Sequence, residues 1–143
     1  MSSGGIRTFL LDTNVFIAAV KDPRRETATL RLILEFLRRE DLLLVGNDLW
    51  LEEMSRYAEG FGSETASQIF TAMIAKTRFV RVAENFRAIC RRFITTPDPA
   101  DILHAATCLQ ERAILVSNDK HFDRIRDEGI IEVWSLTKAI RSL

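Results

Sequence analysis

Four carboxylates in this chain stand where a folded domain could bring them together. They are Asp12, Glu53, Asp101 and Asp119. Carboxylates gathered at one place repel one another unless a cation lies among them. Carboxylate oxygens are also the ligands that hard divalent cations prefer. The four residues therefore predict a divalent-metal site, and such sites generate nucleophiles and stabilise developing negative charge.

The elements that must position these acids alternate between strand and helix. Apolar runs typical of strands occur at residues 8–11, 42–45, 79–82, 114–116 and 131–134. Helical patterns fill most of the intervals, at about residues 22–39, 47–61, 63–78, 84–93, 99–111 and 120–128. This alternation is typical of a parallel sheet flanked by helices. We expect an α/β fold, a three-layer α/β/α sandwich around a mostly parallel sheet.

Start signals mark several of these helices. Asp22 before Pro23 and Asp98 before Pro99 each pair an N-cap residue with a proline at the first helical position. Ser63 is a further predicted N-cap. The caps set the expected helix starts, one of which lies just ahead of Asp101.

Each acid can be placed relative to a strand end, which is where ligands bind in open α/β sheets. Asp12 ends the first strand run, and Asp119 follows the 114–116 run by three residues. Asp101 lies in the first turn of its helix, and Glu53 in the helix after the second run. Taken singly, Asp12 could be a helix cap, Asp101 a partner of the helix dipole and Asp119 a turn residue. Their joint occurrence favours a shared site at one end of the sheet.

Helical geometry separates two adjacent glutamates. At about 100° per residue, Glu53 borders the apolar stripe that contains Trp50, Met54 and Tyr57, whereas Glu52 lies nearly opposite. A carboxylate at the edge of a core face costs stability unless a partner compensates it. We therefore expect Glu53 to face the site and Glu52 to face solvent.

Composition limits the class of protein. The chain has 143 residues, of which 47% are hydrophobic and 28% charged, as in a folded globular domain. We expect one domain over residues 6–143 and a flexible end over residues 1–5. Twenty basic residues balance twenty acidic ones, so no global positive field attracts nucleic acid. No long apolar run or signal-peptide pattern occurs, so we expect a cytoplasmic protein with no membrane association.

The two histidines are less informative. His104 and His121 lack the HxxxH spacing of common zinc sites, and we expect packing or surface positions for them rather than a zinc site.

Several segments together resemble the successive motifs of the PIN domain family. They are Leu-Leu-Asp-Thr-Asn-Val-Phe at 10–16, the Glu53 helix, Asp-Ile-Leu-His-Ala-Ala-Thr at 101–107 and Leu-Val-Ser-Asn-Asp-Lys-His-Phe at 115–122. Their order and spacing span residues 7–134, although segment 63–82 carries no recognisable motif. The resemblance implies a metal-dependent ribonuclease with the four acids around Mg²⁺ or Mn²⁺. Asn14 and Ser117 match polar positions that support the site in relatives, with Ser117 where threonine is usual.

The resemblance also suggests a mechanism and partners. We expect Asp12 and Asp119 to coordinate the main ion, with Glu53 and Asp101 completing or water-bridging its shell. Asn14 and Ser117 would orient these ligands. The expected products of RNA cleavage are a 5′-phosphate and a 3′-hydroxyl. Small relatives are often VapC-like toxins, homodimers held inactive by an antitoxin protein, and the size of this chain favours that group.

Three alternatives stay open at this point. The chain could be a catalytically silent PIN-like domain that binds RNA or protein, although an intact set of four acids argues against it. It could also be an RNA-processing nuclease outside any toxin-antitoxin system. A phosphotransferase related to the haloacid dehalogenases would need a second aspartate at the position of Asn14, which makes that alternative weak.

Overall fold

The computed structural model describes residues 5–21, 27–96 and 98–143. Within these ranges, five strands form one parallel sheet in the order β3-β2-β1-β4-β5. The strands are β1 (Arg7–Leu11), β2 (Leu42–Gly46), β3 (Thr77–Phe79), β4 (Ile114–Val116) and β5 (Val133–Trp134). Strand β1 is central, and the order changes direction beside it. The carboxyl ends of β1 and β4 therefore form the edge at which a ligand is expected.

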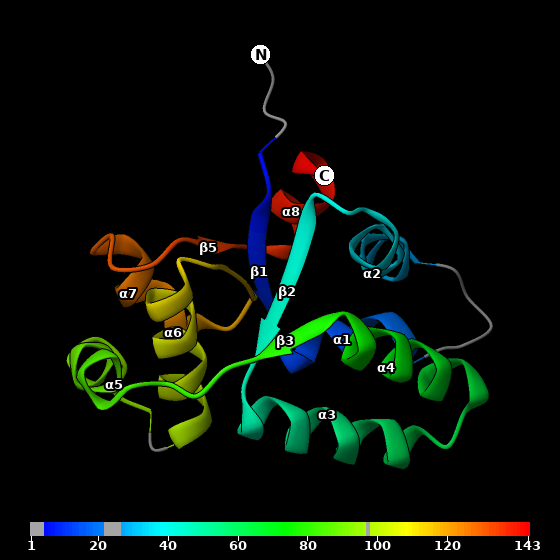
Figure 1. Ribbon diagram of the computed structural model, residues 1–143, viewed down its shortest axis with the longest axis horizontal. Helices are drawn as coiled ribbons and strands as arrows, with labels where there is room; N and C mark the ends of the chain where they lie inside the picture. Colours follow the sequence, from blue (N-terminus) through cyan, green and yellow to red (C-terminus); the bar gives the residue numbers. More distant parts are fainter. Residues whose placement is uncertain (1–4, 22–26, 97) are drawn as a thin grey trace.

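Helices cover both faces of the sheet. They are α1 (Thr13–Val20), α2 (Ala28–Arg38), α3 (Asp48–Phe61), α4 (Glu64–Lys76), α5 (Glu84–Arg91), α6 (Pro99–Glu111), α7 (Asp123–Asp127) and α8 (Leu136–Ser142), with a 3₁₀ turn η1 (Lys120–Phe122). Helices α5 and α6 pack together on one side, and α1, α2 and α4 lie on the other (Figure 1). Helix α3 lies below the carboxyl ends of β1 and β2, where it contacts α1, α4 and α6 (Figure 1). The expected three-layer α/β/α fold is confirmed.

The core centres on the buried strand β1. Phe9 is fully buried and packs edge-on against Phe36 and Trp134, with ring centroids 5.0 and 5.4 Å away. Leu11 pairs with Val116, so β1 and β4 end at the same level. This register places the residues after the two strands, Asp12 and Ser117, beside one another at the edge of the sheet.

The third predicted strand is wrong in its bounds. The strand covers Thr77–Phe79 instead of residues 79–82, because pairing with β2 begins immediately after α4. Thr77 is buried, and its hydroxyl donates to the carbonyl of Met73 in the last turn of α4 over 2.6 Å. Pairing then stops at Gly46, where β2 ends.

Several helix boundaries also differ from the prediction. Helix α2 begins at Ala28, where the Thr27 hydroxyl accepts from the backbone N–H of Leu30, and the predicted Asp22–Pro23 start lies outside the described residues. The predicted helix 120–128 is divided into η1 and α7, α8 was not predicted, and α1 was foreseen only as the helix that Asp12 could cap. Of the predicted flexible end, residues 1–4 lie outside the described residues, and Gly5 is exposed.

The caps of the helices that carry site residues agree with the sequence. Asn47 precedes α3 and accepts from the backbone N–H of Trp50 over 2.9 Å. Asp98 caps α6 by accepting from the backbone N–H of Ala100, with Pro99 at the first position. Within the described ranges, every helix is too short or too polar to span a membrane.

Candidate active site

Asp12 is the most deeply buried of the four acids. Its side chain follows β1 and is 7% exposed. The Ser117 hydroxyl donates to Oδ2 over 2.6 Å, and the backbone N–H of Asn14 approaches Oδ1 at 3.5 Å. Burial raises the pKa of Asp12 above its ordinary value, and the Ser117 hydrogen bond opposes that shift. Asp12 therefore both caps α1 and presents a buried carboxyl group at the sheet edge.

Ser117 joins two of the predicted acids. Its buried hydroxyl donates to Asp12 and accepts from the backbone N–H of Asp119 over 3.0 Å. Asn14 contributes differently, since its exposed side chain makes no hydrogen bond to another described residue. The structure thus gives Ser117 a direct contact with the acids, whereas Asn14 touches Asp12 through its backbone.

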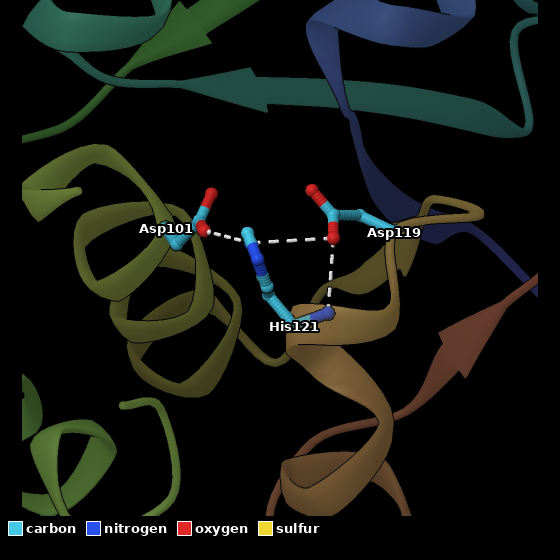
Figure 2. A group of neighbouring side chains, drawn as sticks. All are labelled: Asp101, Asp119 and His121. Carbon is cyan, nitrogen blue, oxygen red and sulfur yellow. Dashed lines mark hydrogen bonds and ion pairs between the residues drawn. The ribbon is translucent and has the colours of Figure 1, made fainter. Parts of the chain in front are cut away.

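Asp101 and Asp119 meet around a histidine. Nδ1 of His121 lies 2.8 Å from Oδ2 of Asp101 and 3.3 Å from Oδ1 of Asp119 (Figure 2). The backbone N–H of His121 also donates to Asp119 over 2.9 Å. One ligand atom from each of the three residues lies within 4.8 Å of the others, close enough to hold one metal ion. His121 was expected at a packing or surface position; it is half exposed, and it is also part of the acidic cluster.

Two members of this cluster, Asp101 and His121, have shifted pKa values. Burial raises the pKa of Asp101, and the hydrogen bond from His121 opposes that rise. The same hydrogen bond, together with the charge of Asp119, raises the pKa of His121. In the absence of a metal ion, the two carboxylates thus favour the protonated form of His121.

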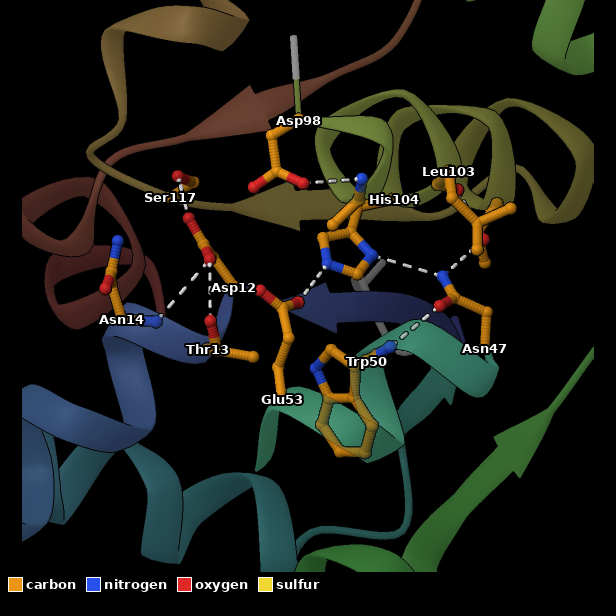
Figure 3. A network of polar contacts seen from close by, with 12 residues as sticks. Asp12, Thr13, Asn14, Asn47, Trp50, Glu53, Asp98, Leu103, His104 and Ser117 are labelled. Carbon is orange, nitrogen blue, oxygen red and sulfur yellow. Dashed lines mark hydrogen bonds and ion pairs between the residues drawn. The ribbon is translucent and has the colours of Figure 1, made fainter. Parts of the chain in front are cut away.

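Glu53 approaches the site from α3. Its side chain is 22% exposed, and Oε1 lies 2.9 Å from Nε2 of the buried His104. Glu52 is exposed, so the predicted orientation of the two glutamates is confirmed. Figure 3 shows the Asp12 and Glu53 side chains both directed to the space beyond the end of β1.

Hydrogen bonds thus arrange the acids in two groups. Asp12 is linked through Ser117 to Asp119, which His121 links to Asp101. Glu53 is held separately, by His104. Behind His104 lies the buried Asn47 (Figure 3), whose amide nitrogen also contacts the buried Thr107 hydroxyl over 2.9 Å. Thr107 lies in the segment 101–107 that resembles a PIN motif, and Asn47 precedes α3 as its cap, but neither was assigned a place in the site from the sequence.

The donor set fits a divalent cation. Among the described residues, no lysine or arginine forms an ion pair with any of the four acids. Burial raises the pKa values of Asp12 and Asp101, so both carboxyl groups favour their neutral forms unless a cation lies nearby. Carboxylates arranged in this way at a sheet edge are suited to Mg²⁺ or Mn²⁺.

Comparison with known proteins agrees with this geometry. Residues 9–128 match the PIN domain family. Among curated protein sequences, none matches this chain.

Several solved structures have a similar fold, among them the following three. VapBC2 from Rickettsia felis, bound to a DNA fragment from its promoter, has a TM-score of 0.59 and 16% identity over 90% of this chain and 98% of that chain. VapBC-1 from nontypeable Haemophilus influenzae has a TM-score of 0.59 and 21% identity over 92% of this chain and 99% of that chain. FitAB bound to an IR36 DNA fragment has a TM-score of 0.52 and 20% identity over 90% of this chain and 94% of that chain. These similarities establish a common fold.

Proposed function

Because the chain belongs to the PIN domain family, we propose that it is a metal-dependent ribonuclease and the toxin of a toxin-antitoxin pair. One observation carries the nuclease assignment. Asp12, Asp101 and Asp119 are joined at the carboxyl end of the sheet by Ser117 and His121, and among the described residues no lysine or arginine neutralises them. This is an arrangement that a divalent cation completes.

Asp12, Glu53, Asp101 and Asp119 would hold Mg²⁺ or Mn²⁺. When bound, the ion would supply an activated water and stabilise the charge that develops on the phosphodiester. Attack of water on phosphorus and departure of the 3′ oxygen would leave a 5′-phosphate and a 3′-hydroxyl.

The residues around the acids have separate roles in this proposal. The Ser117 hydroxyl stabilises the ionised form of Asp12, because it donates to Oδ2. The same hydroxyl fixes the backbone at Asp119. Nδ1 of His121 holds a proton between Asp101 and Asp119 and must give up this position when a cation enters. His121 is half exposed, so its ring has room to turn outward.

The toxin assignment rests on the structural neighbours. VapBC2, VapBC-1 and FitAB are two-component assemblies, and this chain matches more than nine-tenths of each matched chain. A partner protein that covers the acidic edge would keep the nuclease inactive. The proposal therefore includes an antitoxin partner, an RNA substrate and a homodimeric toxin.

Cleavage of a mixed-sequence single-stranded RNA with Mn²⁺, Mg²⁺ or EDTA tests the nuclease. We expect the RNA to be cut when Mn²⁺ or Mg²⁺ is present but not in EDTA, and we expect Asp119→Asn to lose this cleavage. Glu53→Gln should also lose activity, whereas Glu52→Gln, at the adjacent exposed position, is the matched control and should retain it. Unaltered cutting in Asp119→Asn would identify a contaminating nuclease. Metal binding without any cutting would favour an inactive interaction domain.

Expression in cells tests the toxin assignment. We expect growth arrest by the wild-type chain, no arrest by Asp119→Asn, and rescue by the product of a short open reading frame adjacent to its gene. Normal growth together with specific RNA cutting in vitro would instead indicate an RNA-processing nuclease.

A further inference from the structure

We propose that His104 is a positioning residue, held by Asn47 in a single tautomer so that it orients Glu53 toward the metal ion. This inference rests on the proposed function, since it assigns Glu53 to a metal shell. In this arrangement His104 donates from Nε2 to Oε1 of Glu53 and leaves Oε2 free for the cation. The hydrogen-bond partners behind His104 determine the tautomer.

The orientation of the Asn47 amide is the first step. Its oxygen accepts from the backbone N–H of Trp50 over 2.9 Å, as the N-cap of α3 requires. The nitrogen of the same amide must therefore point the other way, toward α6. There it lies 2.9 Å from the Thr107 hydroxyl oxygen and 3.2 Å from Nδ1 of His104.

Thr107 can only accept a hydrogen bond from the Asn47 amide nitrogen. The Thr107 hydroxyl donates its own proton to the carbonyl of Leu103 over 2.7 Å. Its oxygen is thus an acceptor toward Asn47, and one amide N–H is donated there. The second amide N–H faces Nδ1 of His104, which must accept it.

The proton of His104 consequently lies on Nε2. That atom is 2.9 Å from Oε1 of Glu53, so the imidazole donates to the carboxylate. The ring is 2% exposed, and both of its nitrogens have partners, which fixes its rotation. A ring of this kind orients the carboxylate without adding the positive charge of lysine or arginine.

The same hydrogen bonds tie together the two helices that deliver site residues. Asn47 caps α3, which carries Glu53, and His104 lies one turn after Asp101 on α6. These hydrogen bonds thus fix the Glu53 side chain relative to α6, the helix that carries Asp101. Hydrogen-bonding partners of metal ligands typically contribute about 10- to 100-fold to metal affinity.

The substitution Asn47→Asp tests the direction of the hydrogen bonds. Aspartate can still cap α3 by accepting from Trp50, but it has no N–H to give to Nδ1 of His104. Nδ1 would then carry a proton itself, either in the other tautomer or in an imidazolium. The other tautomer would present the lone pair of Nε2 to Glu53. The imidazolium would place a positive charge beside Glu53. Both forms would weaken metal binding. Electrostatics alone predicts the opposite, because an added carboxylate near a cation raises its affinity.

Titration calorimetry with Mn²⁺ on the metal-free protein is the first readout. We expect Asn47→Asp and His104→Leu to bind Mn²⁺ about tenfold or more weakly. His104→Gln should recover most of the affinity, because its amide N–H can replace that of Nε2. Asn118→Asp is the matched control, since Oδ1 of the exposed Asn118 also accepts from a backbone N–H at a helix start, that of Leu136 in α8, and Asn118 lies next to Asp119. It should bind Mn²⁺ at least as tightly as wild type.

Side-chain ¹⁵N NMR of the metal-free protein gives the tautomer directly. We expect a protonated Nε2 and an unprotonated Nδ1 for His104 in the wild type, and a protonated Nδ1 in Asn47→Asp. A protonated Nδ1 in the wild type would overturn the proposal, as would unchanged Mn²⁺ affinity in both Asn47→Asp and His104→Leu. Failure of the nuclease proposal has a different signature: the expected tautomer and Mn²⁺ affinities, with no RNA cutting.

Discussion

The indole N–H of Trp50 donates to the backbone carbonyl of Leu11 over 2.7 Å. Leu11 is the last residue of β1 and directly precedes Asp12, and Trp50 lies in the first turn of α3, three residues before Glu53. The hydrogen bond therefore fixes the helix that carries one predicted ligand against the strand that carries another. Both residues are almost completely buried, so water cannot replace either partner.

Trp50→Phe should separate this hydrogen bond from aromatic packing. Phenylalanine keeps much of the ring contact but leaves the buried Leu11 carbonyl without its donor, which costs about 1 to 3 kcal/mol. We expect a lower free energy of unfolding in urea and weaker Mn²⁺ binding. Phe79, whose ring centroid is 6.0 Å from that of Trp50, provides the control. Phe79→Leu removes an aromatic contact, and we expect it to affect stability more than metal affinity.

A second prediction concerns Lys76 at the end of α4. Its Nζ donates to two backbone carbonyls at the end of α2, that of Phe36 and, over 2.6 Å, that of Arg39. Burial lowers the pKa of Lys76. Lys76→Met should lower the free energy of unfolding by about 1 to 2 kcal/mol, because charged donors satisfy these carbonyls. Urea denaturation measures the loss, and Lys120→Met, at an exposed position, should change stability little.

Much of the fold was predictable because its signals are local. The predicted Ser63 and Asp98 caps begin α4 and α6, and α3 covers nearly the predicted residues 47–61. The third strand was misplaced because its start depends on Thr77 closing α4 and on pairing with β2, which the apolar run 79–82 does not reveal. Helix α2 begins at the Thr27 cap for an equally local reason, but the aspartate-proline pair upstream was the stronger sequence signal.

The site was predictable as a set of acids but not as a network. Asp12, Asp101 and Asp119 could be placed because each follows a strand end or a cap. His121 was missed because its partner Asp101 is 20 residues away in sequence, and only the fold brings the two to 2.8 Å. The partners of His104 were missed for the same reason: Asn47 and His104 are 57 positions apart.

Ser117 provides a third prediction, on the ionisation of Asp12. Burial raises the pKa of Asp12, and the hydrogen bond from the Ser117 hydroxyl lowers it. Removing the hydroxyl should therefore raise this pKa further. Ser117→Ala should therefore bind Mn²⁺ about tenfold more weakly at pH 6, with a smaller loss at pH 8, since protons compete with the metal. Ser117→Thr keeps the hydroxyl and should bind as the wild type does. Equal losses in the alanine and threonine variants would assign the effect to packing.

A fourth prediction follows from the raised pKa of His121 in the metal-free protein. A histidine whose pKa is higher in the folded than in the unfolded state contributes stability that is fully present below the unfolded value, about 6.5. That contribution is lost as pH rises through the higher folded value, which the hydrogen bond to Asp101 and the charge of Asp119 produce. Metal-free wild type should thus lose more stability than His121→Gln between pH 6 and pH 9.

Metal binding should abolish that difference, because a cation held by Asp101 and Asp119, as proposed, would replace the proton on Nδ1 of His121. Calorimetric titrations in buffers of different ionisation enthalpy should therefore show proton release on Mn²⁺ binding near pH 7, and less release from His121→Gln. Thermal unfolding over the same pH range, with and without Mn²⁺, measures the stability change. If His121→Gln matched the wild type in both experiments, His121 would be an exposed neighbour of the acids rather than their counter-charge in the metal-free state.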